Sequence, residues 1–134
     1  MAVPSIYKGL IFYYEKKLKE KSEVRKKLSA MRLMVSGSSS LPIKTFHEWR
    51  EISGHDLLER FGMTETGMVL SNPYVGLRNP GLVGKPMPNV ECQLLNLDTM
   101  EHIEDKGISG ELLVKTPNLF KEYYHNEVAF NESF

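Results

Sequence analysis

A helical pattern between two short apolar stretches constrains the fold of this chain most strongly. Arg32–Val35 predicts a buried strand, and Pro42–Ile52 predicts a helix with Trp49 on its apolar face and Gly54 as its C-terminal stop. A second strand is predicted over Asp56–Arg60. The order strand, helix, strand favours a parallel pair joined by a right-handed crossover. The chain is therefore expected to be an α/β protein.

Two segments rich in glycine and hydroxyl groups follow the predicted strands. Ser36–Ser40 follows the first strand, and Phe61–Glu65 follows the second. Ligands of parallel sheets bind beyond the carboxyl ends of the strands, so we expect both segments to face one cleft. On local grounds alone, the serine run also fits a flexible turn.

The second segment offers groups that suit a nucleotide. Phe61 supplies a flat apolar face for a base, and Gly62 allows a sharp turn or a close approach to a ligand. Thr64 offers a hydroxyl and an amide to a phosphate oxygen. Glu65 is a hard oxygen ligand of the kind that Mg²⁺ prefers.

Three motifs, in order along nearly the whole chain, resemble the adenylate-forming superfamily, which includes the acyl-CoA synthetases. Arg60–Glu65 resembles its aromatic-Gly-x-Thr-Glu signature, although the family usually has tyrosine in place of Phe61. Ser36–Pro42 is similar to the small-residue loop that borders adenine in that family. Gly110–Val114 and Phe120–Tyr124 resemble its Gly-Glu-Leu strand and the aromatic segment that follows.

The resemblance implies ATP, Mg²⁺ and coenzyme A as substrates and cofactor, and it implies roles for the motif residues. Thr64 would contact the α-phosphate and Glu65 would hold the metal, which makes these two the implied catalytic residues. The implied nucleotide-binding residues are Ser38, Ser39, Ser40, Phe61, Gly62, Met63 and Thr64.

Arg60 points to a particular group of acyl-CoA synthetases. The sequence around it looks most like the malonyl-CoA synthetases, and an arginine here would bind the distal carboxylate of malonate in a bidentate way. In that reading Ser36 or Ser38 lines the acyl site and Met68 forms its apolar wall. The alternative is a surface ion pair of Arg60 with Glu59 or Asp56.

The remaining segments predict helices before the first strand and a small sheet near the end. Helices are expected over Pro4–Lys21 and Ser22–Ala30. Strands are expected over Val90–Leu97 and Gly110–Lys115, separated by the polar turn Asp98–Ser109. By resemblance, residues 1–88 belong to the α/β AMP-binding subdomain and residues 89–134 to a β-rich, distorted-barrel subdomain.

Composition excludes several classes of function. Seventeen basic residues balance seventeen acidic ones, so no overall charge favours nucleic acid, and no apolar run approaches the roughly 20 residues of a membrane span. The single cysteine, Cys92, fits an intracellular protein and is interpreted as a packing residue. Asn131–Ser133 matches a glycosylation sequon by chance rather than by design. The mitochondrial matrix is implied by resemblance only, and the cytoplasm is the alternative.

The 134 residues are too few for the two-domain architecture that adenylation requires. The family's phosphate loop, ribose-binding aspartate and catalytic lysine are not among them, so we expect no ligase activity from this stretch alone. Three hypotheses follow: a fragment of a malonate–CoA ligase, which could also use methylmalonate; a fragment of a ligase for a fatty or other carboxylic acid; and a non-catalytic remnant that acts as a binding module.

Overall fold

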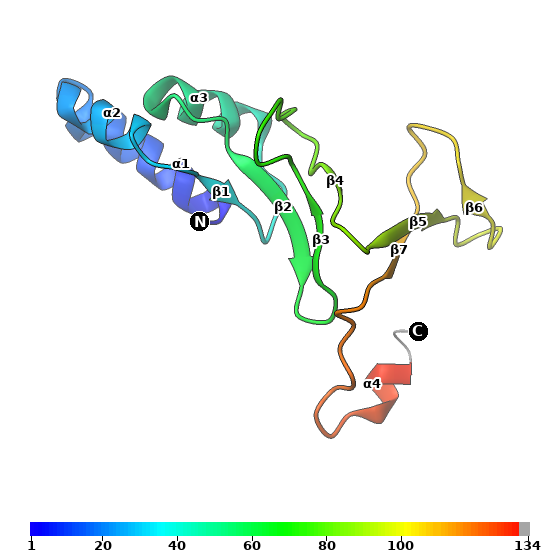
Figure 1. Cartoon of the computed structure of the whole chain (residues 1–134). Coiled ribbons are helices and arrows are strands. Elements are labelled where there is room, and N and C mark those ends of the chain that lie inside the picture. Colours follow the sequence, from blue (N-terminus) through cyan, green and yellow to red (C-terminus); the bar gives the residue numbers. More distant parts are fainter. Residues whose placement is uncertain (132–134) are drawn as a thin grey trace.

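The chain forms two β-sheets with helices gathered at its N-terminal end (Figure 1). The computed structural model describes residues 1–131, so the sequon at residues 131–133 lies largely outside the described residues. The first sheet has the strand order β1-β2-β3-β4, and the second has the order β6-β5-β7. This mixed helix and sheet architecture confirms the α/β prediction.

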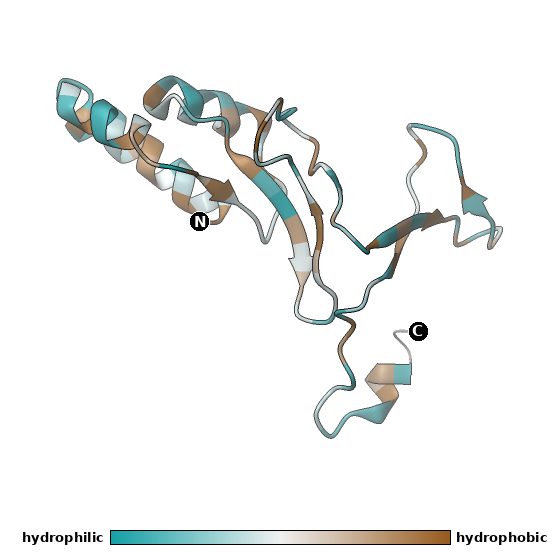
Figure 2. Cartoon of the chain, in the orientation of Figure 1, coloured by the Kyte–Doolittle hydropathy of each residue, from teal (hydrophilic) through white to brown (hydrophobic). Residues whose placement is uncertain are grey.

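Two helices precede the first sheet, and the first of them packs on the hydrophobic core beside it. Helix α1 (Pro4–Tyr13) continues into a π-helical turn over Tyr14–Leu18, and α2 (Ser22–Ser29) follows. The predicted helix over 4–21 is therefore interrupted by a wider turn, which still brings Leu18 against the core. Helix α2 has no buried residue and is coloured mainly as hydrophilic in Figure 2. No helix within residues 1–131 combines the length and the apolar character needed to cross a bilayer.

The predicted strand-helix-strand unit is present. Strand β1 (Val35–Ser36) pairs in parallel with β2 (Leu58–Met63), and α3 (Ile43–Ser53) connects them. Gly54 ends α3 in the left-handed region with φ 75°, where a side chain would be strained. The first strand begins later than the sequence predicted.

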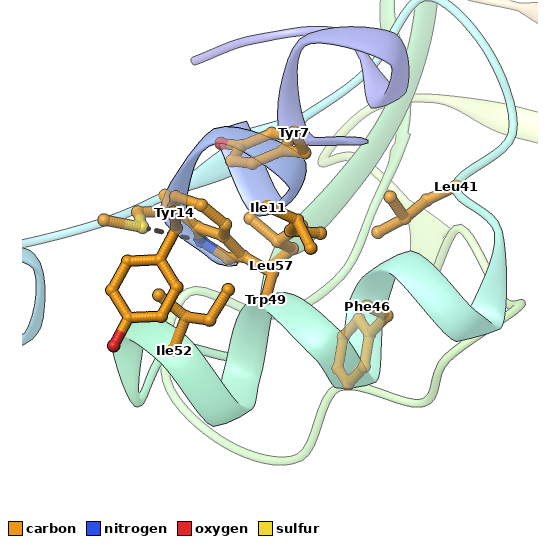
Figure 3. Packing of buried hydrophobic residues seen from close by; sticks show 9 residues of the cluster. Tyr7, Ile11, Tyr14, Leu41, Phe46, Trp49, Ile52 and Leu57 are labelled. Atoms are coloured by element: carbon orange, nitrogen blue, oxygen red, sulfur yellow. Dashed lines mark hydrogen bonds between the residues drawn. The ribbon is translucent and has the colours of Figure 1, made fainter. Parts of the chain in front are cut away.

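The hydrophobic core lies between α1, α3 and the parallel strands (Figure 3). Tyr7 and Trp49 pack edge to face with ring centroids 5.1 Å apart, and Trp49 Nε1 donates to Met34 Sδ at 3.0 Å. The Tyr7 hydroxyl donates to the Val35 carbonyl, which ties α1 to β1. Trp49 is only 3% exposed, as expected for a residue on the apolar face of the predicted helix. This core fixes the position of the parallel strands.

A β-hairpin extends from the parallel pair. Strand β3 (Gly67–Ser71) pairs antiparallel with β2, and β4 (Lys85–Pro86) pairs with the outer side of β3. The predicted strand over 56–60 was placed too early, because β2 begins at Leu58 and continues through residues 61–63. Cross-strand hydrogen bonding to β3 extends the strand through Gly62, with a register shift between Phe61 and Gly62.

The second sheet is a small antiparallel unit. Strand β5 (Glu91–Leu95) lies between β6 (His102–Ile103) and β7 (Glu111–Lys115). The two longer strands match the prediction, whereas β6 lies inside the segment expected to be a turn. Beyond β7 the chain runs past the tip of the β2–β3 hairpin to the short helix α4 (Glu127–Asn131), as Figure 1 shows.

Candidate functional site

A cleft of about 670 Å³ lies beside the carboxyl end of β1 and along β2. The serine loop after β1 forms one wall, β2 and β3 form another, and Leu112 of the second sheet closes a side. The residues that line it are Ser38, Ser39, Ser40, Glu59, Arg60, Phe61, Gly62, Met63, Leu70, Gly81, Val83 and Leu112. The prediction that the two signature segments face one cleft is confirmed for Ser38–Ser40 and for residues 61–63, whereas Ser36, Thr64 and Glu65 do not line it.

Glu59 ties the walls of the cleft together. Its side chain is 7% exposed, and its Oε1 accepts a hydrogen bond from the Leu41 amide at 2.7 Å, which anchors the serine loop to β2. Its backbone carbonyl accepts from the amide of Asn72 at 2.9 Å, and Asn72 Nδ2 donates to the Leu82 carbonyl at 2.7 Å. Two buried residues, Glu59 and Asn72, thus link the serine loop, the hairpin and the segment around Gly81.

Arg60 brings a permanent positive charge to the cleft. Its guanidinium lies over Gly37, where an added Cβ would stand 2.9 Å from both Cζ and Nε, and Nη2 donates to Met1 Sδ at 3.0 Å. It forms no ion pair with a carboxylate among residues 1–131. The alternative of a surface ion pair was therefore wrong, because Asp56 pairs with Arg50 at 3.2 Å and Glu59 is engaged by the Leu41 amide.

Phe61 and Met63 present apolar surface at the same cleft. The Phe61 side chain is 37% exposed, so its ring is accessible to a flat ligand. Gly62 lies between them within β2, so the sharp turn expected there was wrong. An added Cβ would lie 2.3 Å from the Gly67 carbonyl oxygen, so the close approach is to the neighbouring strand.

Thr64 and Glu65 occupy the turn of the hairpin, beyond the residues that line the cleft. Thr64 is exposed, and Glu65 is partly buried. Glu65 Oε1 accepts a hydrogen bond from the Tyr123 hydroxyl at 3.0 Å, and its backbone carbonyl accepts from the Phe120 amide at 2.7 Å. The aromatic segment after β7 thus returns to the turn that carries the predicted metal ligand.

Two predicted acyl-site residues lie outside the lining of the cleft. Ser36 is fully buried in β1, and its Oγ has no hydrogen-bond partner among the described residues. Met68 is 41% exposed on β3, opposite Gly62. Of the residues predicted for the acid, Arg60 and Ser38 are the ones that line the cleft.

Sequence reasoning missed several residues that shape the site. Glu59 was considered only as an ion-pair partner, and Tyr123 only as part of a motif. Arg78 donates to the carbonyls of Asp56, Pro73 and Tyr74, at 2.5 Å, 3.0 Å and 2.7 Å respectively. Charged residues flanked by proline and glycine turns are the signal that could have identified Arg78 as a loop anchor.

The turn residues suit a magnesium–nucleotide complex but not a metal held by protein alone. Within residues 1–131, no three His, Cys, Asp or Glu side chains gather closely enough to bind a metal ion. Mg²⁺ is commonly held by one or two carboxylates together with substrate phosphates. Glu65, with one oxygen engaged by Tyr123, and the neighbouring Thr64 hydroxyl fit that donor set.

The family model of AMP-binding enzymes matches residues 1–124, and the chain belongs to this family. It is 46% identical to the malonate–CoA ligase of Arabidopsis thaliana, over 98% of this chain and 21% of that protein. It is 42% identical to the mitochondrial malonate–CoA ligase ACSF3 of Xenopus laevis, over 100% of this chain and 27% of that protein.

A solved structure shows the same fold. The chain superimposes on a malonyl-CoA ligase with methylmalonyl-CoA and AMP bound, with a TM-score of 0.83 and 34% identity. The match covers 98% of this chain and 27% of that one. The chain thus spans about a quarter of the length of the relatives it matches.

Proposed function

We propose that this chain is part of a malonate–CoA ligase. In the reaction, a carboxylate oxygen of malonate attacks the α-phosphorus of ATP and pyrophosphate leaves. The thiol of coenzyme A then attacks the acyl carbon and displaces AMP, giving malonyl-CoA. The ligase relatives and the cleft formed by the signature segments support this proposal.

One observation carries the choice of substrate. Arg60 is one of the residues that line the cleft, and its guanidinium, which lies over Gly37, has no carboxylate partner within residues 1–131. The charge is permanent, and its planar donors match a carboxylate. A dicarboxylic acid supplies one carboxylate for adenylation and a second for Arg60. A fatty acid offers only an apolar chain at that position.

The remaining lining residues suit the nucleotide. Phe61 is assigned to stack on adenine, and the loop of Ser38, Ser39 and Ser40 is assigned to border it, because both stand at the same cleft. Thr64 is assigned to the α-phosphate. Thr64 and Glu65 directly follow Met63, which lines the cleft, so phosphates extending from the base are assigned to the hairpin turn.

Glu65 is the residue assigned to Mg²⁺. When bound, the ion would neutralise the charge that develops on the phosphate oxygens. Glu65 and Thr64 hold their positions through the hairpin, whose strands are fixed by the core at the other end.

The compartment, the substrate range and the division into subdomains belong to the same proposal. The animal relatives named ACSF3 are mitochondrial, which supports the matrix, and the methylmalonyl-CoA complex of a relative supports methylmalonate as a second substrate. The change of sheet between Pro86 and Glu91 supports a boundary near residue 88. The isolated 134 residues are proposed to be inactive.

A charge-removal variant tests the role of Arg60 in the complete polypeptide that carries this sequence. In Arg60→Met, kcat/KM for malonate should fall by about 100-fold, because losing one partner of a desolvated charge pair costs about 2–5 kcal/mol. The KM for ATP should stay within about twofold. Arg32→Met is the matched control, since Arg32 is exposed and outside the cleft. Unchanged malonate kinetics in Arg60→Met would refute the assignment.

A further inference from the structure

The aromatic segment after β7 holds the turn of the β2–β3 hairpin at more than one point. The Phe120 amide binds the Glu65 carbonyl at 2.7 Å, and the Tyr123 hydroxyl binds Glu65 Oε1 at 3.0 Å across 58 residues of sequence. The Asn118 side chain lies against Gly67, 3.3 Å from where a Cβ would stand. In Figure 1 the chain beyond β7 passes the hairpin tip on its way to α4.

These contacts act on different parts of Glu65. The backbone hydrogen bond fixes the main chain of the turn, whereas the phenol fixes the carboxylate itself. A free glutamate side chain samples several rotamers, and fixing it in one of them costs conformational entropy. A carboxylate already held through one oxygen avoids that cost when its other oxygen binds a cation.

We propose that Tyr123 is a positioning residue that orients the Glu65 carboxylate towards a divalent cation bound with ATP. The proposal rests on the assignment of Glu65 to the metal. The phenol donates to Oε1 and leaves Oε2 for the cation. The segment that follows β7 of the second sheet thereby becomes part of the nucleotide site at the β2–β3 turn of the first sheet.

The neighbouring tyrosine provides a matched control. Tyr124 is 89% exposed, and its ring packs against His125 with centroids 4.1 Å apart. Tyr123 instead packs against Phe120 with centroids 4.7 Å apart. A Tyr123→Phe change keeps this ring contact and removes the hydroxyl alone.

The test measures cation affinity directly in the complete polypeptide. Mn²⁺ binding is followed by electron paramagnetic resonance in the presence of a non-hydrolysable ATP analogue, for the wild type, Tyr123→Phe, Tyr124→Phe and Glu65→Gln. We expect Tyr123→Phe to weaken Mn²⁺ binding by about tenfold, the usual effect of losing a hydrogen bond to a metal ligand. Glu65→Gln should weaken it at least as much, and Tyr124→Phe should match the wild type.

The outcomes separate this inference from the assignment on which it rests. If Glu65→Gln weakens Mn²⁺ binding and Tyr123→Phe does not, the positioning role is overturned while the metal assignment stands. The same holds if Tyr123→Phe lowers only the urea midpoint, because Tyr123 is then a purely structural anchor. If Glu65→Gln leaves Mn²⁺ binding unchanged, the metal assignment fails and the positioning role fails with it.

Discussion

Gly62 stands where the hairpin has no room for a side chain, and this makes Gly62→Ala the sharpest structural test. A Cβ at this position would lie 2.3 Å from the Gly67 carbonyl oxygen and 2.9 Å from the Met68 Cα. Both are backbone atoms, so relief requires the strands to separate or shift. The pairing of β2 with β3 already has a register shift at this point. Because the clash is with backbone atoms, the movement of a single flexible side chain cannot relieve it.

The expected cost is that of overpacking a well-packed site. Such changes destabilise by about 1–3 kcal/mol, and the backbone nature of the clash places Gly62→Ala in the upper part of that range. Urea unfolding of the 134-residue chain can be followed by the fluorescence of Trp49, its single tryptophan, which is 3% exposed in the core. With a urea m-value of about 1.5 kcal/mol/M, the midpoint should fall by about 1–2 M.

Gly9→Ala is the matched control for this substitution. Gly9 lies within α1, and nothing stands within 4 Å of an added Cβ. The substitution should therefore raise stability by about 0.5–1 kcal/mol, because alanine loses less backbone entropy in a helix. If Gly62→Ala were as stable as the wild type while Gly9→Ala behaved as expected, the pairing of β2 with β3 at this point would be refuted.

Three further substitutions or reactions test the site and its surroundings. Gly37→Ala should raise the KM for malonate by about tenfold in the complete polypeptide, because the methyl group displaces the Arg60 guanidinium; an unchanged KM would argue against that contact. Glu59→Ala should lower the free energy of unfolding by about 1–3 kcal/mol, because it leaves the buried Leu41 amide without its acceptor. Glu59→Gln keeps an acceptor and should lower the free energy of unfolding less in the same urea titration. Burial raises the pKa of the Cys92 thiol, so less thiolate forms near pH 8. Iodoacetamide should therefore alkylate Cys92 more slowly than it alkylates free cysteine, and an equal rate would contradict this burial.

The parallel unit could be predicted because its signals are local. The apolar face of Pro42–Ile52 has a helical period, Trp49 anchors it, and Gly54 supplies the left-handed residue that ends it. The parallel pairing of β1 with β2 then places the serine loop and the end of β2 at the same edge of the sheet. The cleft followed from topology, and the structure brings Ser38–Ser40 and residues 61–63 together as expected, while Thr64 and Glu65 lie beyond its lining.

The hairpin and the short strands could not be predicted in the same way. Glycine at position 62 indicates the end of a strand, whereas here it permits close pairing with β3. The turn carries no Asn-Gly or Asp-Gly pair, and Gly67 with φ 69° is its only strong turn residue. Strands β4 and β6 are only two residues long, and their pairing with β3 and β5, respectively, is what defines them as strands.

Long-range contacts at the site leave no trace in local sequence. The Tyr123–Glu65 hydrogen bond spans 58 residues, and the role of Glu59 depends on the Leu41 amide 18 residues away. The lack of a carboxylate partner for Arg60 within residues 1–131 also depends on its neighbours, since Asp56 pairs with Arg50. Residue types indicated the chemistry of the site, but only the fold decides which charged side chains lack an oppositely charged protein partner and can bind a ligand.

The most direct measurement is the substrate preference of the complete polypeptide. AMP formation should be followed with ATP, coenzyme A and either malonate or butyrate, an acid of similar size that lacks the second carboxylate. We expect kcat/KM for malonate to exceed that for butyrate by about 100-fold or more, the value of one well-placed charge pair in a partly dry pocket. Equal use of the two acids, or a preference for butyrate or longer fatty acids, would contradict the account.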